Sequence, residues 1–190
     1  SVTASGDNSI TLGQFNVASG TLSVAIGSQI SSSAQSSTAF GYSTTASGNY
    51  STAMGEGTRA SDRSSLVIGQ YNLLGSTVTN SATDFSTDNT AFVIGNGADS
   101  DNRSDALVVK FNGDATLAGN LNINSDARLK ANIVSLGSTL SKLLQIDGKS
   151  YTMKKDGSEK QKIGLLAQDI EKVFPELVSE SHGVKSVNYQ

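Results

Sequence analysis

The stretch "SITLGQFNVASGTLSVAIG", residues 9–27, contains a pattern that continues through the first third of the chain. A serine is followed by three residues and a glycine, and the motif returns after fourteen residues. Five copies occur without an insertion: Ser9–Gly13, Ser23–Gly27, Ser37–Gly41, Ser51–Gly55 and Ser65–Gly69. Self-similarity at a fixed period is the sequence signature of a repeat architecture.

Two further features share this period. "ASG" stands at 4–6, 18–20 and 46–48, with degenerate copies at 32–34 and 60–62. The residue before each motif glycine is always large and apolar: Leu12, Ile26, Phe40, Met54 and Ile68. The sequence leaves open whether these side chains face a core or the outside. A disordered Gly/Ser linker has no reason to keep them in register, so we expect an ordered repeat.

The repeat favours short strands over helices. Gly and Ser at this density disfavour helix, and a helical period would spread the pattern around the helix surface. Glycine supplies turn conformations, and small Ala and Ser side chains let successive coils stack closely. Each unit then forms one coil of a mostly β, parallel β-solenoid, with two short strands and two turns. A coil buries only about three apolar side chains, a thin core that would gain from packing against other copies.

These repeats resemble the head repeat of trimeric autotransporter adhesins over residues 4–69. The resemblance implies a left-handed parallel β-roll in which three identical chains pack side by side, as a homotrimer in a stalk-like extracellular module. It names no ligand. We therefore assign residues 1–69 to β-roll head repeats.

Residues 70–124 break the period and predict a β-rich neck or connector in which chains intertwine. "TAFVIGNG" at 90–97 repeats the coil motif after a polar insertion. "DALVVKFNGDATLAGNLNI" at 105–123 alternates as strands do, and its Asn-Gly pair at 112–113 is a strong hairpin signal.

The composition changes after Ile123. Residues 1–124 carry four basic and nine acidic groups, whereas residues 125–190 carry ten basic and eight acidic ones. The overall formal charge of −3 gives no electrostatic case for nucleic acid or an anionic membrane surface. The chain has no cysteine, which excludes disulfides and thiolate metal sites, and no apolar run is long enough to cross a bilayer. We expect no cofactor, no metal, no nucleic-acid partner and no membrane insertion.

Residues 125–190 predict a small α+β domain. Leu136, Leu140, Leu143 and Leu144 fall on one face of an amphipathic helix. Two strands around a Lys/Asp/Gly turn follow, then a short helix over 167–174 that Pro175 ends, then a hairpin around His182-Gly183.

Three motifs of this region resemble the S74 peptidase family in order and spacing: "SDARLKANI" at 125–133, "KIGLLAQDIEKVFPELV" at 162–178 and "KSVNYQ" at 185–190. Members are C-terminal intramolecular chaperones of phage tail spikes and fibres. The resemblance implies a domain that trimerises and folds the β-structured fibre ahead of it and then cuts itself off. Members continue past "VNY" into a helical segment, so we expect the C-terminal helical part of the domain to be missing here.

The resemblance also implies the site residues. Ser125 and Lys130 are the predicted catalytic pair, and the bond between Asn124 and Ser125 is the predicted cleavage site. Asp126 and Arg128 are expected to position the loop. Gln168 is expected to hydrogen-bond near the site or to cap the short helix.

The residues themselves allow this chemistry. A serine hydroxyl is a poor nucleophile and needs a base, and with no cysteine and a single histidine, lysine is the natural candidate. Lysine becomes a base only if burial or nearby cations lower its pKa from about 10.4 toward neutrality. Without the resemblance, a serine and a lysine in a polar turn would be the plainer interpretation.

Other candidates favour plain structural roles. His182 lies in a predicted turn and is expected to be a surface loop residue. Acidic and amide side chains crowd residues 98–105, but they lack the glycine and glutamate spacing of an EF-hand and are expected to be exposed turn residues: Asp99, Asp101, Asn102 and Asp105.

Together the two resemblances imply the C-terminal part of a trimeric phage tail fibre or spike, located in the virion, with a self-cleaving chaperone and a cell-surface receptor that is a glycan or a protein. Any enzymatic activity would be a single self-cleavage and not turnover. The alternative is a bacterial trimeric adhesin, extracellular and at the cell surface, with a binding head and a non-cleaving cap. An inert structural spacer is a third possibility.

Overall fold

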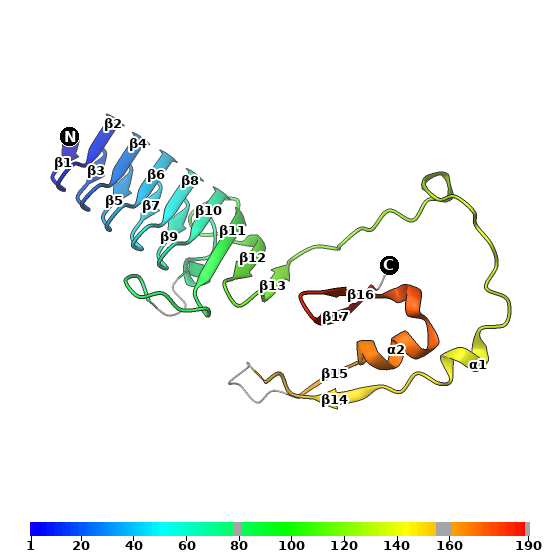
Figure 1. Ribbon diagram of the computed structural model, residues 1–190. Helices are drawn as coiled ribbons and strands as arrows, with labels where there is room; N and C mark the ends of the chain where they lie inside the picture. Colours follow the sequence, from blue (N-terminus) through cyan, green and yellow to red (C-terminus); the bar gives the residue numbers. More distant parts are fainter. Residues whose placement is uncertain (78–80, 155–160, 189–190) are drawn as a thin grey trace. The chain divides into compact units, whose positions relative to one another are not determined.

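The computed structural model describes residues 1–77, 81–154 and 161–188 (Figure 1). The chain divides into two compact units, Ser1–Leu121 and Asn122–Gln190.

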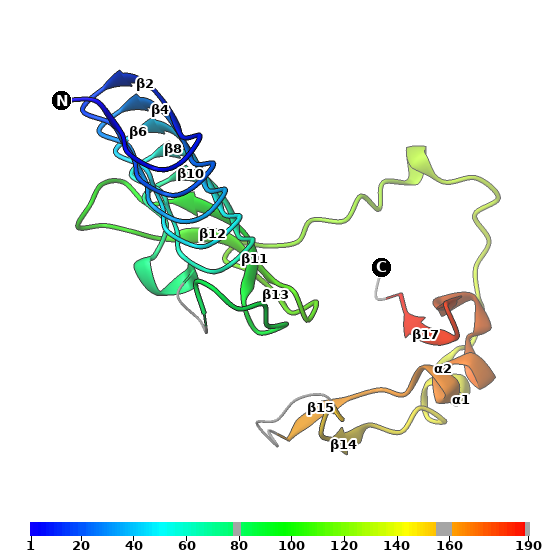
Figure 2. The same cartoon turned by 60° about the vertical axis from the view of Figure 1, so that its left-hand side comes forward.

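The first unit is a parallel β-solenoid, as the repeat predicts. The coils stack along one axis, which Figure 2 shows most clearly. One ladder of two-residue strands comprises β1 (Thr3–Ala4), β3 (Val17–Ala18), β5 (Ser31–Ser32), β7 (Thr45–Ala46) and β9 (Arg59–Ala60). A second ladder of five-residue strands comprises β2 (Ile10–Gln14), β4 (Val24–Ser28), β6 (Thr38–Tyr42), β8 (Thr52–Glu56) and β10 (Leu66–Gln70). Each coil thus contributes one strand to each ladder.

The motif glycines are required by the stacking of the coils. Gly27 has φ = 134°, and a Cβ atom there would lie 1.9 Å from the carbonyl oxygen of Gly41 in the next coil. Gly41 stands in the same relation to Gly55, at 2.0 Å. Both the backbone conformation and the close approach therefore exclude a side chain at this position.

The core consists of small side chains, and the large apolar residues of the motif point away from it. Ala25, Ala39 and Ala53 are completely buried, whereas Phe40 is 49% and Met54 43% exposed. The parallel register aligns Leu12 with Ile26, Ile26 with Phe40, and Phe40 with Met54. We call this outer row, which includes Ile68, the outer apolar column. A coil buries two apolar side chains, such as Ala39 and Ala46, or three, as with Ala18, Ala25 and Ile30, so the core is as thin as expected.

The solenoid sheet continues past the last regular repeat. After an insertion that contains a 3₁₀ turn, η1 (Leu74–Thr77), strand β11 (Thr90–Asn96) pairs in parallel with β10, with Ile68 opposite Ile94. The predicted echo of the coil motif is therefore a further rung. Asp62, which replaces the glycine of the "ASG" motif, accepts a hydrogen bond from the Thr90 backbone N–H at 2.9 Å.

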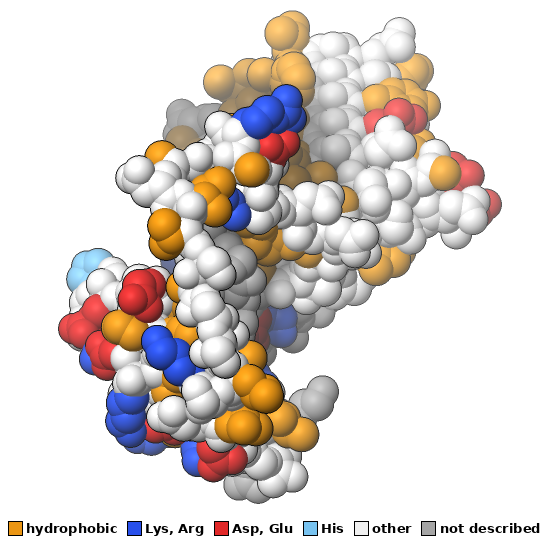
Figure 3. Space-filling model, turned by 90° about the vertical axis from the view of Figure 1, so that its right-hand side faces the viewer, with side chains coloured by type: hydrophobic (Ala, Val, Ile, Leu, Met, Phe, Trp, Pro, Cys, Tyr) orange, Lys and Arg blue, Asp and Glu red, His pale blue; other side chains and the backbone are white. Residues whose placement is uncertain are grey.

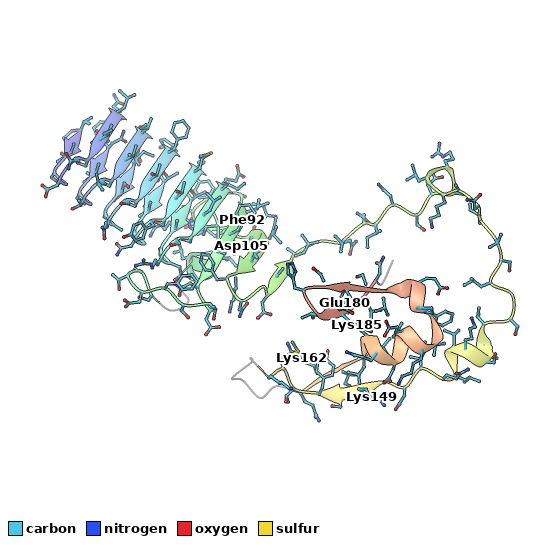
Figure 4. All side chains as sticks on the ribbon, in the orientation of Figure 1. Phe92, Asp105, Lys149, Lys162, Glu180 and Lys185 are labelled. Carbon is cyan, nitrogen blue, oxygen red and sulfur yellow. The ribbon has the colours of Figure 1, made fainter. Side chains whose placement is uncertain are left out.

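Two antiparallel strands end this sheet. β12 (Asp105–Lys110) pairs with β11 and β13 (Ala115–Leu117) pairs with β12, which confirms the hairpin predicted at the Asn-Gly pair. Gly113 in that turn has φ = 93°. Figure 4 labels Phe92 on β11 and Asp105 on β12.

The second unit has the predicted mixture of short helices and hairpins. Its elements are η2 (Ala127–Leu129), α1 (Leu140–Leu143), β14 (Lys149–Tyr151), β15 (Lys162–Gly164), α2 (Ala167–Val173), η3 (Pro175–Leu177), β16 (Val178–Ser181) and β17 (Val184–Val187). β14 pairs with β15 and β16 with β17, both antiparallel. Helix α1 is shorter than the leucine pattern predicts. Residues 155–160 of the predicted Lys/Asp/Gly turn lie outside the described residues.

This unit has almost no core of its own. Among its described residues, Ile170 is the one fully buried apolar side chain, whereas Leu136, Leu140 and Leu144 are 78%, 65% and 77% exposed. Hydrophobic side chains also lie at the surface in many places on the face drawn in Figure 3. None of the helices in the described ranges has the length and apolar character needed to span a bilayer.

Candidate functional site

A single 3₁₀ turn brings the predicted serine and lysine together. The turn η2 (Ala127–Leu129) is closed by hydrogen bonds from the Leu129 N–H to the Asp126 carbonyl, at 3.0 Å, and from the Lys130 N–H to the Ala127 carbonyl, at 3.1 Å. Across it, Lys130 Nζ lies 2.8 Å from Ser125 Oγ, in hydrogen-bond geometry. A general base must lie within about this distance of the proton that it removes.

Asp126 and Arg128 are bonded to each other around this turn, and their role as positioning residues stays a prediction. Asp126 caps η2, because its Oδ1 accepts the Arg128 backbone N–H at 2.8 Å. The Arg128 guanidinium also donates to this carboxylate, with Nη2 2.7 Å from Oδ2. These bonds from Arg128, the side-chain bond first, hold the pKa of Asp126 below its ordinary value and raise the pKa of Arg128. Asp126 thus compensates the charge of Arg128, while no carboxylate is seen to pair with Lys130 within the described ranges.

The turn lies entirely at the surface. Every residue from 112 to 138 is exposed, including Ser125 and Lys130. The apolar residues nearest to the pair are exposed as well, with Leu129 at 68% and Ile133 at 66%. A single chain therefore holds Ser125 and Lys130 in contact but leaves both side chains in solvent.

The remaining candidates lie apart from the pair. Gln168, near the N-terminus of α2, is exposed and forms no hydrogen bond with Ser125 or Lys130 among the described residues, so its role stays a prediction. His182 is exposed in the β16–β17 turn, where its Nδ1 lies 2.9 Å from Ser181 Oγ. Asp99 accepts the backbone N–H groups of Asp101 and Asn102 in an exposed turn. The described part of the chain contains no group of His, Cys, Asp or Glu arranged to hold a metal ion.

Sequence reasoning missed an apolar hollow in the second unit. It has a volume of about 400 Å³ and is lined by Leu136, Thr139, Leu143, Phe174, Glu176 and Leu177. The helical spacing of Leu136 and Leu143 hinted at one wall. Phe174 and Leu177 lie about thirty residues after Leu143 in the sequence. No local sequence pattern connects these two segments.

Comparison with known protein families now places both units. Residues 125–179 match the Peptidase S74 family model, described as the chaperone of endosialidase. Residues 4–29, 32–58 and 46–72 match the YadA head domain repeat. Head-like repeats in the N-terminal part and an S74-like C-terminal region are thus both matched by family models, which confirms both resemblances seen in the sequence.

One similar protein is the long tail fiber protein Gp37 of Salmonella phage S16, which is 34% identical over 90 residues. The similar region covers 42% of this chain and only 12% of the length of the phage protein. No solved structure matches the chain.

Proposed function

We propose that this chain is the C-terminal part of a trimeric phage tail fibre, whose last domain folds the fibre and then detaches itself between Asn124 and Ser125. One observation carries the proposal: Lys130 Nζ lies 2.8 Å from Ser125 Oγ in a turn close to the boundary between the two units. The S74 match and the tail-fibre similarity support a virion component. The proposed domains are head repeats (1–69), a neck (70–124) and the chaperone (125–190).

The proposed reaction is an acyl transfer followed by hydrolysis. Lys130 accepts the Ser125 hydroxyl proton as Oγ attacks the carbonyl carbon of Asn124. The C–N bond then breaks and the nitrogen of Ser125 takes up the proton, which leaves an ester between the Asn124 carbonyl and Ser125 Oγ. Water hydrolyses this ester, so that one product ends in the Asn124 carboxylate and the other begins with the free amine of Ser125.

The homotrimer is part of the proposal, and exposed apolar surface supports it. On the solenoid, the outer apolar column leaves Leu12 65% and Phe40 49% exposed, in register along the sheet. Contiguous apolar rows of this kind mark interaction surfaces. Three left-handed β-rolls packed through these columns would bury them, as the trimeric habit of the two matched families suggests.

A detachable trimeriser suits a fibre of this construction. Parallel coils and contacts between chains are non-local, and such topologies fold slowly and leave strand edges exposed meanwhile. A C-terminal domain that joins three chains raises their effective concentration and fixes their register. Once the fibre has folded, the trimeriser is dispensable, which is why the cut belongs at the boundary.

The test is cleavage of the full-length protein during expression. The smaller product should begin at Ser125, which N-terminal sequencing reads directly. Ser125→Ala should stay intact because no hydroxyl remains, and Lys130→Arg should stay intact because guanidinium does not give up its proton near neutral pH. Ser135→Ala, a change to another exposed serine of the same segment, is the control and should be cut at the normal rate. Normal processing of Ser125→Ala would falsify the dyad.

The match to the YadA head repeat favours one alternative, a bacterial surface adhesin in which the same head binds a host glycan or protein and the last domain is an uncut cap. Such a protein would be extracellular, at the bacterial surface. It would remain uncut in the wild type while binding cells. A tail fibre should instead be found cut in purified virions, without its last domain.

A further inference from the structure

The turn that carries the serine–lysine pair also presents an unburied leucine. Leu129 lies between Arg128 and Lys130 in the sequence, belongs to η2, and is 68% exposed. Burial of this side chain would bring apolar surface next to Lys130. It would thus supply the desolvation that the exposed pair lacks.

The hollow of the same unit lacks an occupant. Its wall residues remain in contact with solvent, with Leu136 78% and Leu143 51% exposed. A volume of about 400 Å³ is ample for an aliphatic side chain. The chain does not fill the hollow with its own turn, because Leu129 remains exposed in the single chain.

The charges around the hollow and the turn are complementary. Glu176 is the one acidic residue of the lining, and it is exposed. Next to Leu129, Arg128 uses Nε and Nη2 on Asp126, while its Nη1 donates no hydrogen bond among the described residues. A guanidinium has five N–H donors in a planar fork, so Arg128 can bind a second carboxylate without releasing the first.

We propose that the hollow of each subunit receives Leu129 of a neighbouring copy, with Arg128 bridging Asp126 and Glu176 of the partner subunit. This inference rests on the proposed self-cleavage and specifies what completes the site. Each turn inserts into the next subunit, so the contact is head-to-tail, and in the proposed trimer the three contacts close into a ring. Each serine–lysine pair is then completed only by its neighbour, and cleavage waits for assembly.

Paired cysteines test the contact without relying on activity. The chain has no cysteine of its own, so Leu129→Cys with Leu143→Cys provides the only thiols. In the uncleavable Ser125→Ala background, mild oxidation of the full-length trimer should give covalent dimers and trimers on non-reducing gels. The control pair, Leu129→Cys with Leu144→Cys, should give far fewer, because Leu144 does not line the hollow. Monomers that are only internally linked, or no crosslinks, would overturn the proposal.

A mixed-subunit experiment tests the consequence for cleavage. Leu143→Asp should slow cleavage about tenfold or more, because a carboxylate enters the apolar wall, whereas Leu144→Asp should stay within about twofold of wild type. Co-expression of the Leu143→Asp chain with a tagged Ser125→Ala chain should restore its cleavage, because the tagged subunit offers an intact hollow. Cleavage of Leu143→Asp at full rate alone, or no rescue in mixed trimers, would refute the contact. A wild type that is never cut would instead refute the self-cleavage itself.

Discussion

The two units of this chain treat their apolar residues in opposite ways. The solenoid buries alanines, such as Ala39 and Ala53, between backbones stacked so closely that Gly27 and Gly41 have no room for a side chain. The second unit holds many leucines yet fully buries, among its described apolar residues, only Ile170. The solenoid is therefore ordered by backbone contacts along the chain, whereas the second unit leaves most of its leucines exposed.

The two units therefore differ in which contacts are expected to stabilise them. A coil needs the coils before and after it, which the same chain provides. Most leucines of the second unit stay exposed in the single described chain, and buried apolar area is the main stabilising term for a small domain. The solenoid should thus tolerate changes on its outside better than in its stack, and the second unit should respond chiefly to changes at contacts between chains.

The largest effect is expected from Gly41→Val. The new side chain would clash with the carbonyl oxygen of Gly55 and would force a β-branched residue to φ = 122°. We expect a loss of about 3–5 kcal/mol or failure of the solenoid to fold, measured by thermal melting followed by circular dichroism. Gly119→Val is the matched control, because nothing lies within 4 Å of its added Cβ atom, and it should melt like wild type. Equal melting of the two variants would disprove the stacking account.

The next effect is expected from Phe40→Asp, which should prevent assembly of the proposed trimer. Phe40 is 49% exposed in the middle of the outer apolar column, so a carboxylate there should leave the coil intact but prevent packing between solenoids. Light scattering should show fewer trimers, with strand content retained by circular dichroism. Ser33→Asp changes an exposed serine of the solenoid outside the column and should remain trimeric. If Phe40→Asp assembles like wild type, the column is not the interface.

A smaller effect is expected at the turn. Asp126→Ala removes the cap of η2 and should slow self-cleavage about five- to tenfold, because Ser125 and Lys130 are then held together less often. Asp126→Asn keeps a side-chain acceptor and should stay within about threefold of wild type. The lowered pKa of Asp126 means that its bonds persist above the ordinary value near 4 and weaken only as pH falls through the lower folded value. Cleavage timed by gel in the full-length protein measures all three effects, and equal rates for Ala and wild type would exclude the capping role.

Much of the solenoid fold could be predicted because the same fourteen-residue motif occurs five times in register. Five copies of one motif give the coil, its two strands and its glycine turns. The direction of the large residues could not be predicted, since alternation places Ala39 and Phe40 on opposite faces without saying which face is inside. The narrow interior of each coil holds mainly small side chains such as alanine, so the large residues of the motif face outward. The width of that interior is set by the folded coil and cannot be seen in the sequence.

The candidate site likewise has one part that the sequence could predict and one part that it could not. The proximity of Ser125 and Lys130 is local, and a short turn with Asp126 as its cap produces it, so sequence motifs were sufficient to point to the pair. The hollow was missed because Leu136 and Phe174 meet only after the unit folds. Contacts between residues distant in sequence, within or between chains, carry no local signature.

The smallest effect concerns an ion pair inside the second unit. Lys185 on β17 donates to Glu171 on α2 and also lies opposite Glu180 on β16, which Figure 4 labels beside it. The hydrogen bond to Glu171 chiefly, and the charges of both glutamates, raise the pKa of Lys185. A raised lysine pKa stabilises the folded state below the unfolded value of about 10.4, and this contribution disappears as pH rises through the folded pKa. Partly exposed pairs of this kind contribute little.

Lys185→Met should therefore lower the melting temperature of the full-length Ser125→Ala protein by no more than about 5 °C at pH 7, and the difference should shrink as pH rises through the raised folded pKa of Lys185. Lys154→Met, a change to an exposed lysine without a partner glutamate in the described structure, should leave the melting temperature unchanged. A much larger loss from Lys185→Met would mean that the second unit is held together by its own polar contacts. The contrast with the solenoid would then weaken, because the unit would not need its neighbours to be stable.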